Sequence, residues 1–210
     1  MPNTASDRTI APLESPKLGE PYLLTPGPLT TAYSVKEAML RDWGSWDGDF
    51  RAMTSDLRRQ LLDIAGDTKG EFGCVPMQGS GSFSVEAMLG SFVPRDGKVL
   101  VLSNGAYGKR IAQTLSYLGR DHITIDKGDY MPPRGPEVAA ALDADPAITH
   151  VVVIHCETSS GILNPLKEIS DTVYAHGRKL LVDSMSAFGA VPAGLADFRY
   201  EAIVSSANKC

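Results

Sequence analysis

The sequence predicts an α/β fold in which a mostly parallel sheet is covered by helices on both faces. From residue 72 onward, short apolar segments alternate with segments of helical periodicity. The apolar segments are rich in β-branched residues and lack the alternation of a half-exposed strand, which indicates strands covered on both faces. Small polar residues and glycines follow several of them, and ligands of such sheets bind beyond the carboxyl ends of the strands. Functional residues are therefore expected at these ends.

The size and charge of the chain argue against several other classes of protein. Its 210 residues, 43% of them hydrophobic, can form one large domain whose core needs no disulfide or metal. The net charge is −5 and no basic block occurs, so nucleic acid is not an expected partner. No run of about 18 apolar residues occurs, so no membrane-spanning helix is expected. The three widely spaced cysteines indicate reduced thiols in a cytoplasmic protein and no metal site.

The N-terminal part is predicted to be an arm of residues 1–30 that contains a tight turn. The first residues are polar and lack the apolar stretch of a signal peptide. The turn consists of Thr25, Pro26, Gly27 and Pro28, where two prolines around a glycine exclude a helix. Beyond it we expect a helix over 35–41, a loop over 43–50 and an amphipathic helix over 51–65 that ends at Gly66.

Residues 31–210 are assigned to the domain that holds the sheet. Strands are expected at 72–77, 98–103, 122–125, 150–155, 179–183 and 202–205. Helices are expected at 82–91, 108–118, 135–144 and 165–176. Connections between parallel strands through such helices are right-handed, which limits the possible topologies.

A glycine- and serine-rich turn between the first predicted strand and its helix is a candidate phosphate site. It contains Ser80, Gly81 and Ser82. Glycines let backbone N–H groups approach a ligand, and hydroxyls and a helix N-terminus favour an anion. The turn matches neither a P-loop nor the full dinucleotide-binding pattern. It could also be an ordinary turn with Ser82 as the helix N-cap.

Two charged residues stand at the ends of later strands. Asp183 ends the segment KLLVD, where a half-buried carboxylate needs a cation, a metal, a helix N-terminus or a protonated heterocycle as its partner, unless it caps the next turn. Lys209 follows the apolar residues 202–204, so desolvation could lower its pKa toward that of a nucleophilic amine. Alternatively, Lys209 is a surface lysine.

Two further strand ends carry groups that suit a flat cofactor. Tyr107, between two glycines, could stack on its ring or fill the core, and Thr158 could donate a hydrogen bond to a ligand oxygen. A phosphate site, a stacking ring, a carboxylate and an amine together match pyridoxal 5'-phosphate. Its aldehyde needs a lysine, its pyridine nitrogen an acid and its phosphate N–H and hydroxyl donors.

These residues resemble the class V (fold type I) pyridoxal-phosphate-dependent aminotransferases. The resembling motifs run from LLTPGPLTT (23–31) through QGSGSFSVEA (78–87), SNGAYG (103–108), HCETSSGILNP (155–165) and VDSMSAFG (182–189) to SSANKC (205–210). The resemblance implies a three-layer α/β/α large domain. Family members continue beyond the lysine into a small C-terminal domain, so residues 31–210 are expected to be a partial large domain, truncated just after Lys209.

The resemblance also implies a role for each site residue. Lys209 would form the Schiff base with the cofactor and act as general base and acid, and Asp183 would pair with the pyridinium nitrogen. Tyr107 would stack on the ring and Thr158 would contact its hydroxyl side. Ser80, Gly81 and Ser82 would hold the phosphate, and Thr25, Pro26, Gly27 and Pro28 would line the substrate side. No metal is implied.

The motifs SNGAYG and SSANKC are similar to the phosphonate branch of the family. That branch implies transamination of 2-aminoethylphosphonate with pyruvate, giving phosphonoacetaldehyde and L-alanine in phosphonate catabolism, by a cytoplasmic homodimer whose partner subunit adds a phosphate contact. The alternatives are another class V enzyme, either an alanine–glyoxylate-type aminotransferase or a phosphonate lyase, and an inactive fragment. A nucleotide-binding domain is disfavoured, because no Walker lysine or ribose-binding acid is placed for it.

Overall fold

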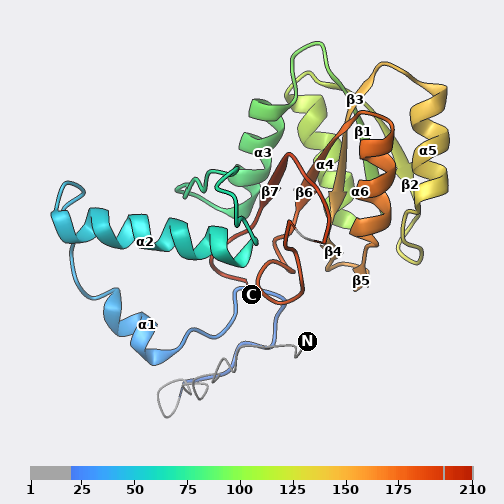
Figure 1. The fold of residues 1–210 in the computed structure, drawn as a ribbon. Helices are drawn as coiled ribbons and strands as arrows, with labels where there is room; N and C mark the ends of the chain where they lie inside the picture. The colour runs from blue at the N-terminus through green and yellow to red at the C-terminus, as the bar shows by residue number, and fades with distance from the viewer. Residues whose placement is uncertain (1–19, 196, 210) are drawn as a thin grey trace, which may run out of the picture.

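The structure is a computed structural model that describes residues 20–195 and 197–209 (Figure 1). Its helices are α1 (Tyr33–Ala38), α2 (Gly48–Ile64), α3 (Gly81–Phe92), α4 (Ala106–Tyr117), α5 (Gly135–Ala144) and α6 (Leu166–Ala175). Its strands are β1 (Lys98–Ser103), β2 (Asp121–Asp126), β3 (Ile148–Ile154), β4 (Cys156–Glu157), β5 (Ile162–Leu163), β6 (Lys179–Asp183) and β7 (Ala202–Val204). In this part of the chain no helix combines the length and the apolar character needed to cross a membrane.

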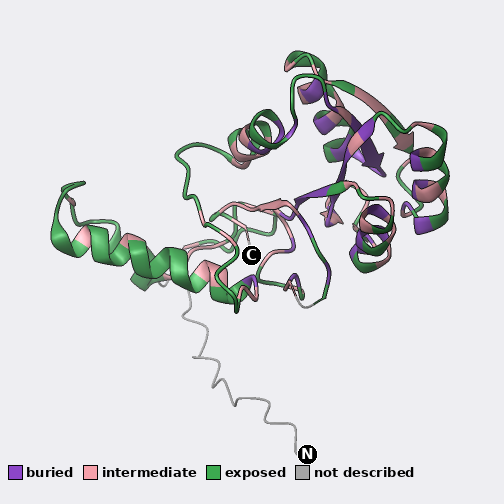
Figure 2. Cartoon of the chain, turned by 45° about the horizontal axis from the view of Figure 1, so that its top comes forward, coloured by how far each residue is buried: buried purple, intermediate pink, exposed green. Residues whose placement is uncertain are grey.

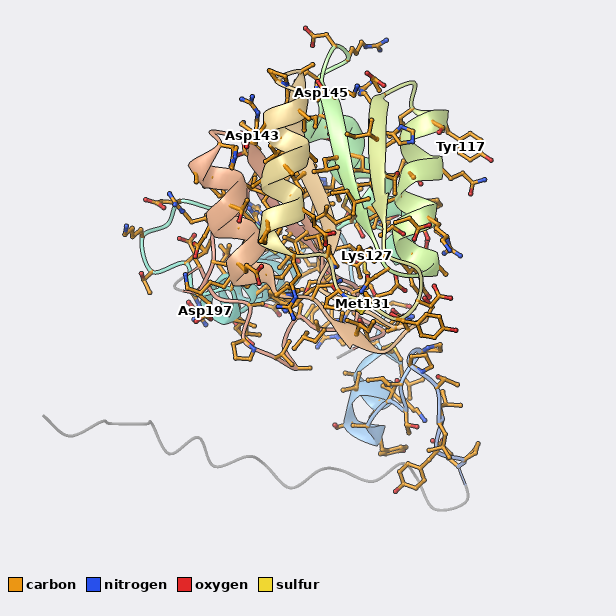
Figure 3. The ribbon with its side chains drawn as sticks, turned by 90° about the vertical axis from the view of Figure 1, so that its right-hand side faces the viewer. Tyr117, Lys127, Met131, Asp143, Asp145 and Asp197 are labelled. Carbon is orange, nitrogen blue, oxygen red and sulfur yellow. The ribbon has the colours of Figure 1, made fainter. Side chains whose placement is uncertain are left out.

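Five strands form a parallel sheet in the order β2-β1-β3-β6-β7. The predicted α/β class with a mostly parallel sheet is therefore confirmed. Because β1 lies between β2 and β3, the direction of strand addition reverses there, and ligands of open α/β sheets bind at such a reversal. Lys127 follows β2 and Asp145 precedes β3, and Figure 3 shows these two residues at opposite ends of the sheet.

The sheet is covered on both faces, which explains its continuous apolar strands. Alternate residues of β1 point to opposite faces: Val99 and Val101 belong to one buried cluster, and Leu100 and Leu102 belong to the other. The first cluster includes residues of α3 and α4, and the second includes residues of α5 and α6. The core thus consists of two apolar layers on either side of one sheet, and buried residues gather there (Figure 2).

The strand predicted over 72–77 is absent, which corrects the sequence-based expectation. Phe72 packs its ring against Tyr200, with 5.4 Å between the centroids, and Val75 is 76% exposed. Pro76 has no N–H for a ladder hydrogen bond, and Gly73 weakens a strand. The apolar residues of this segment therefore serve a loop that leads into α3.

Two further differences concern the N-terminal half and a small hairpin. Helix α2 begins at Gly48, inside the predicted loop over 43–50, and ends before Gly66 as expected. None of its residues is buried, and the helix extends away from the sheet (Figures 1 and 2). The antiparallel pair β4–β5 was not predicted, because two-residue strands show no periodicity.

Candidate active site

A cavity of about 230 Å³ lies beyond the carboxyl ends of the central strands. All seven residues predicted to bind the cofactor line it: Ser80, Gly81, Ser82, Tyr107, Thr158, Asp183 and Lys209. They come from the start of α3, the start of α4, the hairpin after β3, the end of β6 and the turn after β7. The structure therefore brings together residues that lie up to 129 positions apart in the sequence (209 − 80).

The start of helix α3 forms one end of the cavity. Ser80 is the N-cap residue, so the alternative of Ser82 as the N-cap is wrong. Among the described residues, no side chain donates or accepts a capping hydrogen bond at this helix start. The first N–H groups of a helix have no intrahelical acceptor, and the helix dipole makes this end electropositive. The N–H and hydroxyl groups of residues 80–82 can therefore bind an anion such as a phosphate.

Asp183 is a buried carboxylate, only 4% exposed, at the end of β6. Its Oδ1 accepts a hydrogen bond of 3.0 Å from the N–H of Met185. Burial raises the pKa of Asp183 to about 6, the Met185 N–H opposes this rise, and the negative charge of Glu157 adds to it. A buried carboxylate without a countercharge is costly, so this site favours a cationic partner such as a protonated ring nitrogen.

Lys209 is half-buried and meets the N-terminal turn. Its Nζ donates a hydrogen bond of 3.3 Å to the carbonyl of Gly27, and the N–H of Leu29 donates to Asn208 O at 3.2 Å. Gly27 has a φ of +141°, and a Cβ at this position would overlap the Lys209 side chain. Glycine at position 27 thus permits both the backbone conformation and the close approach of the lysine. The described cavity-lining residues do not include Thr25, Pro26, Gly27 or Pro28. The turn nevertheless contacts Lys209, which lines the cavity.

Tyr107 stands in the first turn of α4 with its ring against the cavity. It is 38% exposed, which argues against the alternative that it fills the core. The guanidinium of Arg110 lies 5.2 Å from the centroid of this ring and also lines the cavity. Sequence reasoning missed Arg110, although residues three apart on a helix share a face, and this spacing from Tyr107 could have indicated it.

Sequence reasoning also missed Glu157, which is fully buried at the end of β4. Its carboxylate accepts hydrogen bonds from the N–H groups of Tyr107 and Gly108, at 3.1 and 3.2 Å. It also accepts from Ser159, at 3.2 Å from the N–H and 2.7 Å from the hydroxyl. Its position one residue before Thr158 was the only sequence signal, because its partners on α4 lie about 50 residues away.

Buried polar pairs fix the strand ends beneath the cavity. Asn104 and Asn164 exchange two amide hydrogen bonds, at 2.9 and 3.2 Å, and so join the end of β1 to the hairpin. His155 Nδ1 lies 3.0 Å from the Ser184 hydroxyl, and burial lowers the pKa of His155 to about 4. The neutral ring of His155 therefore supports the segment next to Asp183 without adding a charge.

The cavity has the groups that pyridoxal 5'-phosphate requires. An anion site, a stacking ring, a buried carboxylate and an amine surround one space, as this cofactor needs. The structure of the chain is also similar to that of pyridoxamine–pyruvate aminotransferase from Mesorhizobium loti, with a TM-score of 0.82 at 27% identity. The alignment covers 94% of this chain and 50% of the aminotransferase. The fold is that of the large domain of class V, fold type I aminotransferases.

Within this class, the sequence is similar to the 2-aminoethylphosphonate–pyruvate transaminases. It is 86% identical over 193 residues to the enzyme of that name from Rhizobium meliloti (strain 1021), which covers 92% of this chain and 50% of the relative. It is 70% identical over 195 residues to a second one, from Paraburkholderia xenovorans (strain LB400), over 93% of this chain and 50% of the relative. The chain thus spans about half the length of the curated relatives it matches. No family model matches the sequence.

Proposed function

We propose that this chain forms the cofactor-binding part of an enzyme that transfers the amino group of 2-aminoethylphosphonate to pyruvate, giving phosphonoacetaldehyde and L-alanine. The observation that carries the proposal is that Asp183, Lys209 and residues 80–82 line one cavity. The chain is also 86% identical to a protein named 2-aminoethylphosphonate–pyruvate transaminase. Further similar relatives carry the same name, which favours this reaction over the alanine–glyoxylate and lyase alternatives. The pathway served would be phosphonate catabolism.

The residues of the cavity would hold pyridoxal 5'-phosphate by all its polar groups. When bound, this cofactor supplies an aldehyde that forms a Schiff base with an amine and a pyridinium ring that withdraws electrons from the reacting carbon. Ser80, Gly81 and Ser82 would hold the phosphate at the start of α3. Tyr107 would cover the ring, and Thr158 would donate a hydrogen bond to its hydroxyl oxygen.

Asp183 would keep the ring nitrogen protonated. Burial raises the pKa of Asp183 because the site disfavours an uncompensated negative charge. A pyridinium proton beside the carboxylate would remove that cost, and the ion pair would in turn maintain the charge on which the electron withdrawal depends.

Lys209 would hold the aldehyde in the resting enzyme and move the proton in turnover. As a free amine, Lys209 could take up the proton of the amine-bearing substrate carbon and then give it up again, as general base and then general acid. The contact between Lys209 and Gly27 supports a substrate-side role for Thr25, Pro26, Gly27 and Pro28, because this turn borders the reacting amine.

We propose the same domain division as the sequence indicates, with an arm over 1–30 and a partial large domain over 31–210; residues 1–19 of the arm lie outside the described part. We also propose a cytoplasmic homodimer. The exposed apolar side chains of the N-terminal half support an interface, among them Leu24, Leu40 and Trp46 at 95%, 84% and 83% exposure. The free thiols of Cys74 and Cys156 agree with a reducing compartment.

The proposal is tested by loading the protein with pyridoxal 5'-phosphate and recording the visible absorbance of the lysine-bound cofactor. We expect the band in the wild-type protein and its loss in Lys209→Ala, with Lys179→Ala as a control lysine that pairs with Glu201 away from the cavity. Product analysis with 2-aminoethylphosphonate and pyruvate should give alanine and phosphonoacetaldehyde. A band that survives in Lys209→Ala contradicts the assignment of this lysine. Turnover of a different amine, with none of 2-aminoethylphosphonate, contradicts the proposed substrate.

A further inference from the structure

We infer that Glu157 positions two walls of the cavity by fastening the start of α4, which carries Tyr107, to the hairpin that carries Thr158. This inference rests on the proposed function, because it concerns the residues that would face the cofactor. Glu157 itself is not among the described cavity-lining residues. It is therefore a positioning residue, which acts through Tyr107 and Thr158.

Each carboxylate oxygen of Glu157 serves a different wall. Oε2 accepts the N–H groups of Tyr107 and Gly108, which are the second and third residues of α4. Oε1 accepts both the N–H and the hydroxyl of Ser159, one residue beyond Thr158. A buried charge requires compensation by a countercharge or by hydrogen bonds. The carboxylate of Glu157 is not exposed to solvent, and four hydrogen bonds supply this compensation without a cation.

Ser159 extends this connection to a third N–H group of the helix. Its hydroxyl oxygen accepts the Ala106 N–H at 2.8 Å while its proton is donated to Glu157. The first three residues of α4 are thus all bound by the hairpin, and the negative charge of Glu157 lies at the electropositive end of the helix dipole. The ring of Tyr107 is attached to the backbone that these bonds hold.

Gly105 provides the space for this arrangement. A Cβ at position 105 would overlap the side chain of Glu157 and the hydroxyl of Ser159. A residue other than glycine would therefore displace the carboxylate from the helix. Glu157 also affects the cavity electrostatically, since its charge contributes to the raised pKa of Asp183.

Helix α5 offers a matched control. Glu168 accepts the Gly135 N–H at 2.7 Å with one oxygen and pairs with Arg134 at 3.2 Å with the other. It therefore fastens the start of α5 to α6 by the same kind of bond, but neither helix contributes a described residue to the cavity wall. Glu168→Gln repeats the chemical change of Glu157→Gln at a helix start that should not matter for the cofactor.

The first test measures amide hydrogen exchange in the cofactor-free protein. Glu157→Gln replaces one accepting oxygen by an NH₂ group, which must face either the α4 N–H groups or Ser159. Either the amides of Tyr107 and Gly108 or the amide of Ser159 should therefore exchange at least about tenfold faster. Glu168→Gln should accelerate the Gly135 amide and leave these three unchanged. If Glu157→Gln does not fold, Ser159→Ala keeps the carboxylate and should accelerate the Ala106 amide. Unchanged exchange at the amides of Tyr107, Gly108 and Ser159 overturns the inference.

The second test is a double-mutant cycle on the dissociation constant of pyridoxal 5'-phosphate. If Glu157 acts through Tyr107, Glu157→Gln should weaken binding about tenfold, and adding it to Tyr107→Ala should cost much less than that. Circular dichroism of the bound cofactor should change in Glu157→Gln and not in Glu168→Gln. Additive effects in the cycle, or equal losses in both glutamine variants, overturn the positioning role. A wild-type protein that binds no cofactor instead overturns the proposed function, and the exchange test still decides whether the fastening exists.

Discussion

Replacing Asp183 by asparagine is expected to stabilise the cofactor-free protein and to weaken cofactor binding. The substitution preserves shape, and the asparagine oxygen can still accept the Met185 N–H that Asp183 Oδ1 accepts at 3.0 Å. It removes only the ability to carry a charge. The side chain is 4% exposed and lines the cavity, so the NH₂ of the asparagine has the space that the cofactor would use.

The magnitude follows from the pKa of Asp183, which burial raises from 3.8 to about 6. An acid with a raised pKa in the folded state holds its proton more tightly there than in the unfolded chain. Its favourable contribution is therefore complete below about pH 4 and is lost as the pH rises through about 6. A difference of about two pH units corresponds to about 3 kcal/mol at neutral pH, as an upper value. Asparagine does not incur this loss.

The assay is urea unfolding of the cofactor-free wild-type and Asp183→Asn proteins at about pH 4 and about pH 8. We expect the variant to be more stable by up to about 3 kcal/mol at the higher pH and nearly equal at the lower one. His155 titrates in both proteins, so its contribution cancels in the difference. Cofactor affinity should fall about tenfold or more, since the neutral amide cannot form an ion pair with a pyridinium. A variant that is less stable at about pH 8, or whose advantage does not depend on pH, would refute the reasoning.

Three other expectations concern single residues. Gly27→Ala should weaken cofactor binding about tenfold or more, because its Cβ would overlap Lys209. Gly70→Ala, also at positive φ but without a neighbour within 4 Å, should lower only the stability of the protein. Equal cofactor affinity in the two variants contradicts this expectation. Arg110→Gln should weaken binding of pyridoxal 5'-phosphate more than binding of unphosphorylated pyridoxal, measured by fluorescence titration, and equal losses would mean that the guanidinium does not serve the phosphate. The pKa of His155, lowered to about 4, means that the protein loses stability as the pH falls from about 6.5 to 4; His155→Gln should flatten this loss in urea unfolding, and an unchanged loss assigns it to another group.

The central sheet could be predicted because its strands are buried on both faces. The segments of β1, β3 and β6 each contain a run of apolar residues without alternation, a pattern typical of a doubly covered strand. Polar residues after such strands, Asp183 and Thr158 among them, were then expected at one edge, and the cavity lies at that edge. The strand end is thus the feature that sequence predicts well.

Features that depend on distant partners could not be predicted in the same way. The segment 72–77 has strand-like composition, but it packs Phe72 against Tyr200 instead of joining the sheet. The apolar stripe of α2 correctly indicated a helix but gave no information on what covers it. The role of Glu157 depends on bonds to residues about 50 positions earlier, for which no local pattern exists.

Hydrogen bonds join residues 27–29 to residues 208–209. Gly27 and Lys209, one of the bonded pairs, lie 182 positions apart in the sequence. During synthesis on the ribosome, the turn emerges long before its partner, and contacts of such sequence separation form late in folding. The turn must therefore remain without this partner until β7 has docked on β6. In the proposed function, capture of vitamin B6 by Lys209 is consequently expected to follow the docking of the last strand of the described sheet.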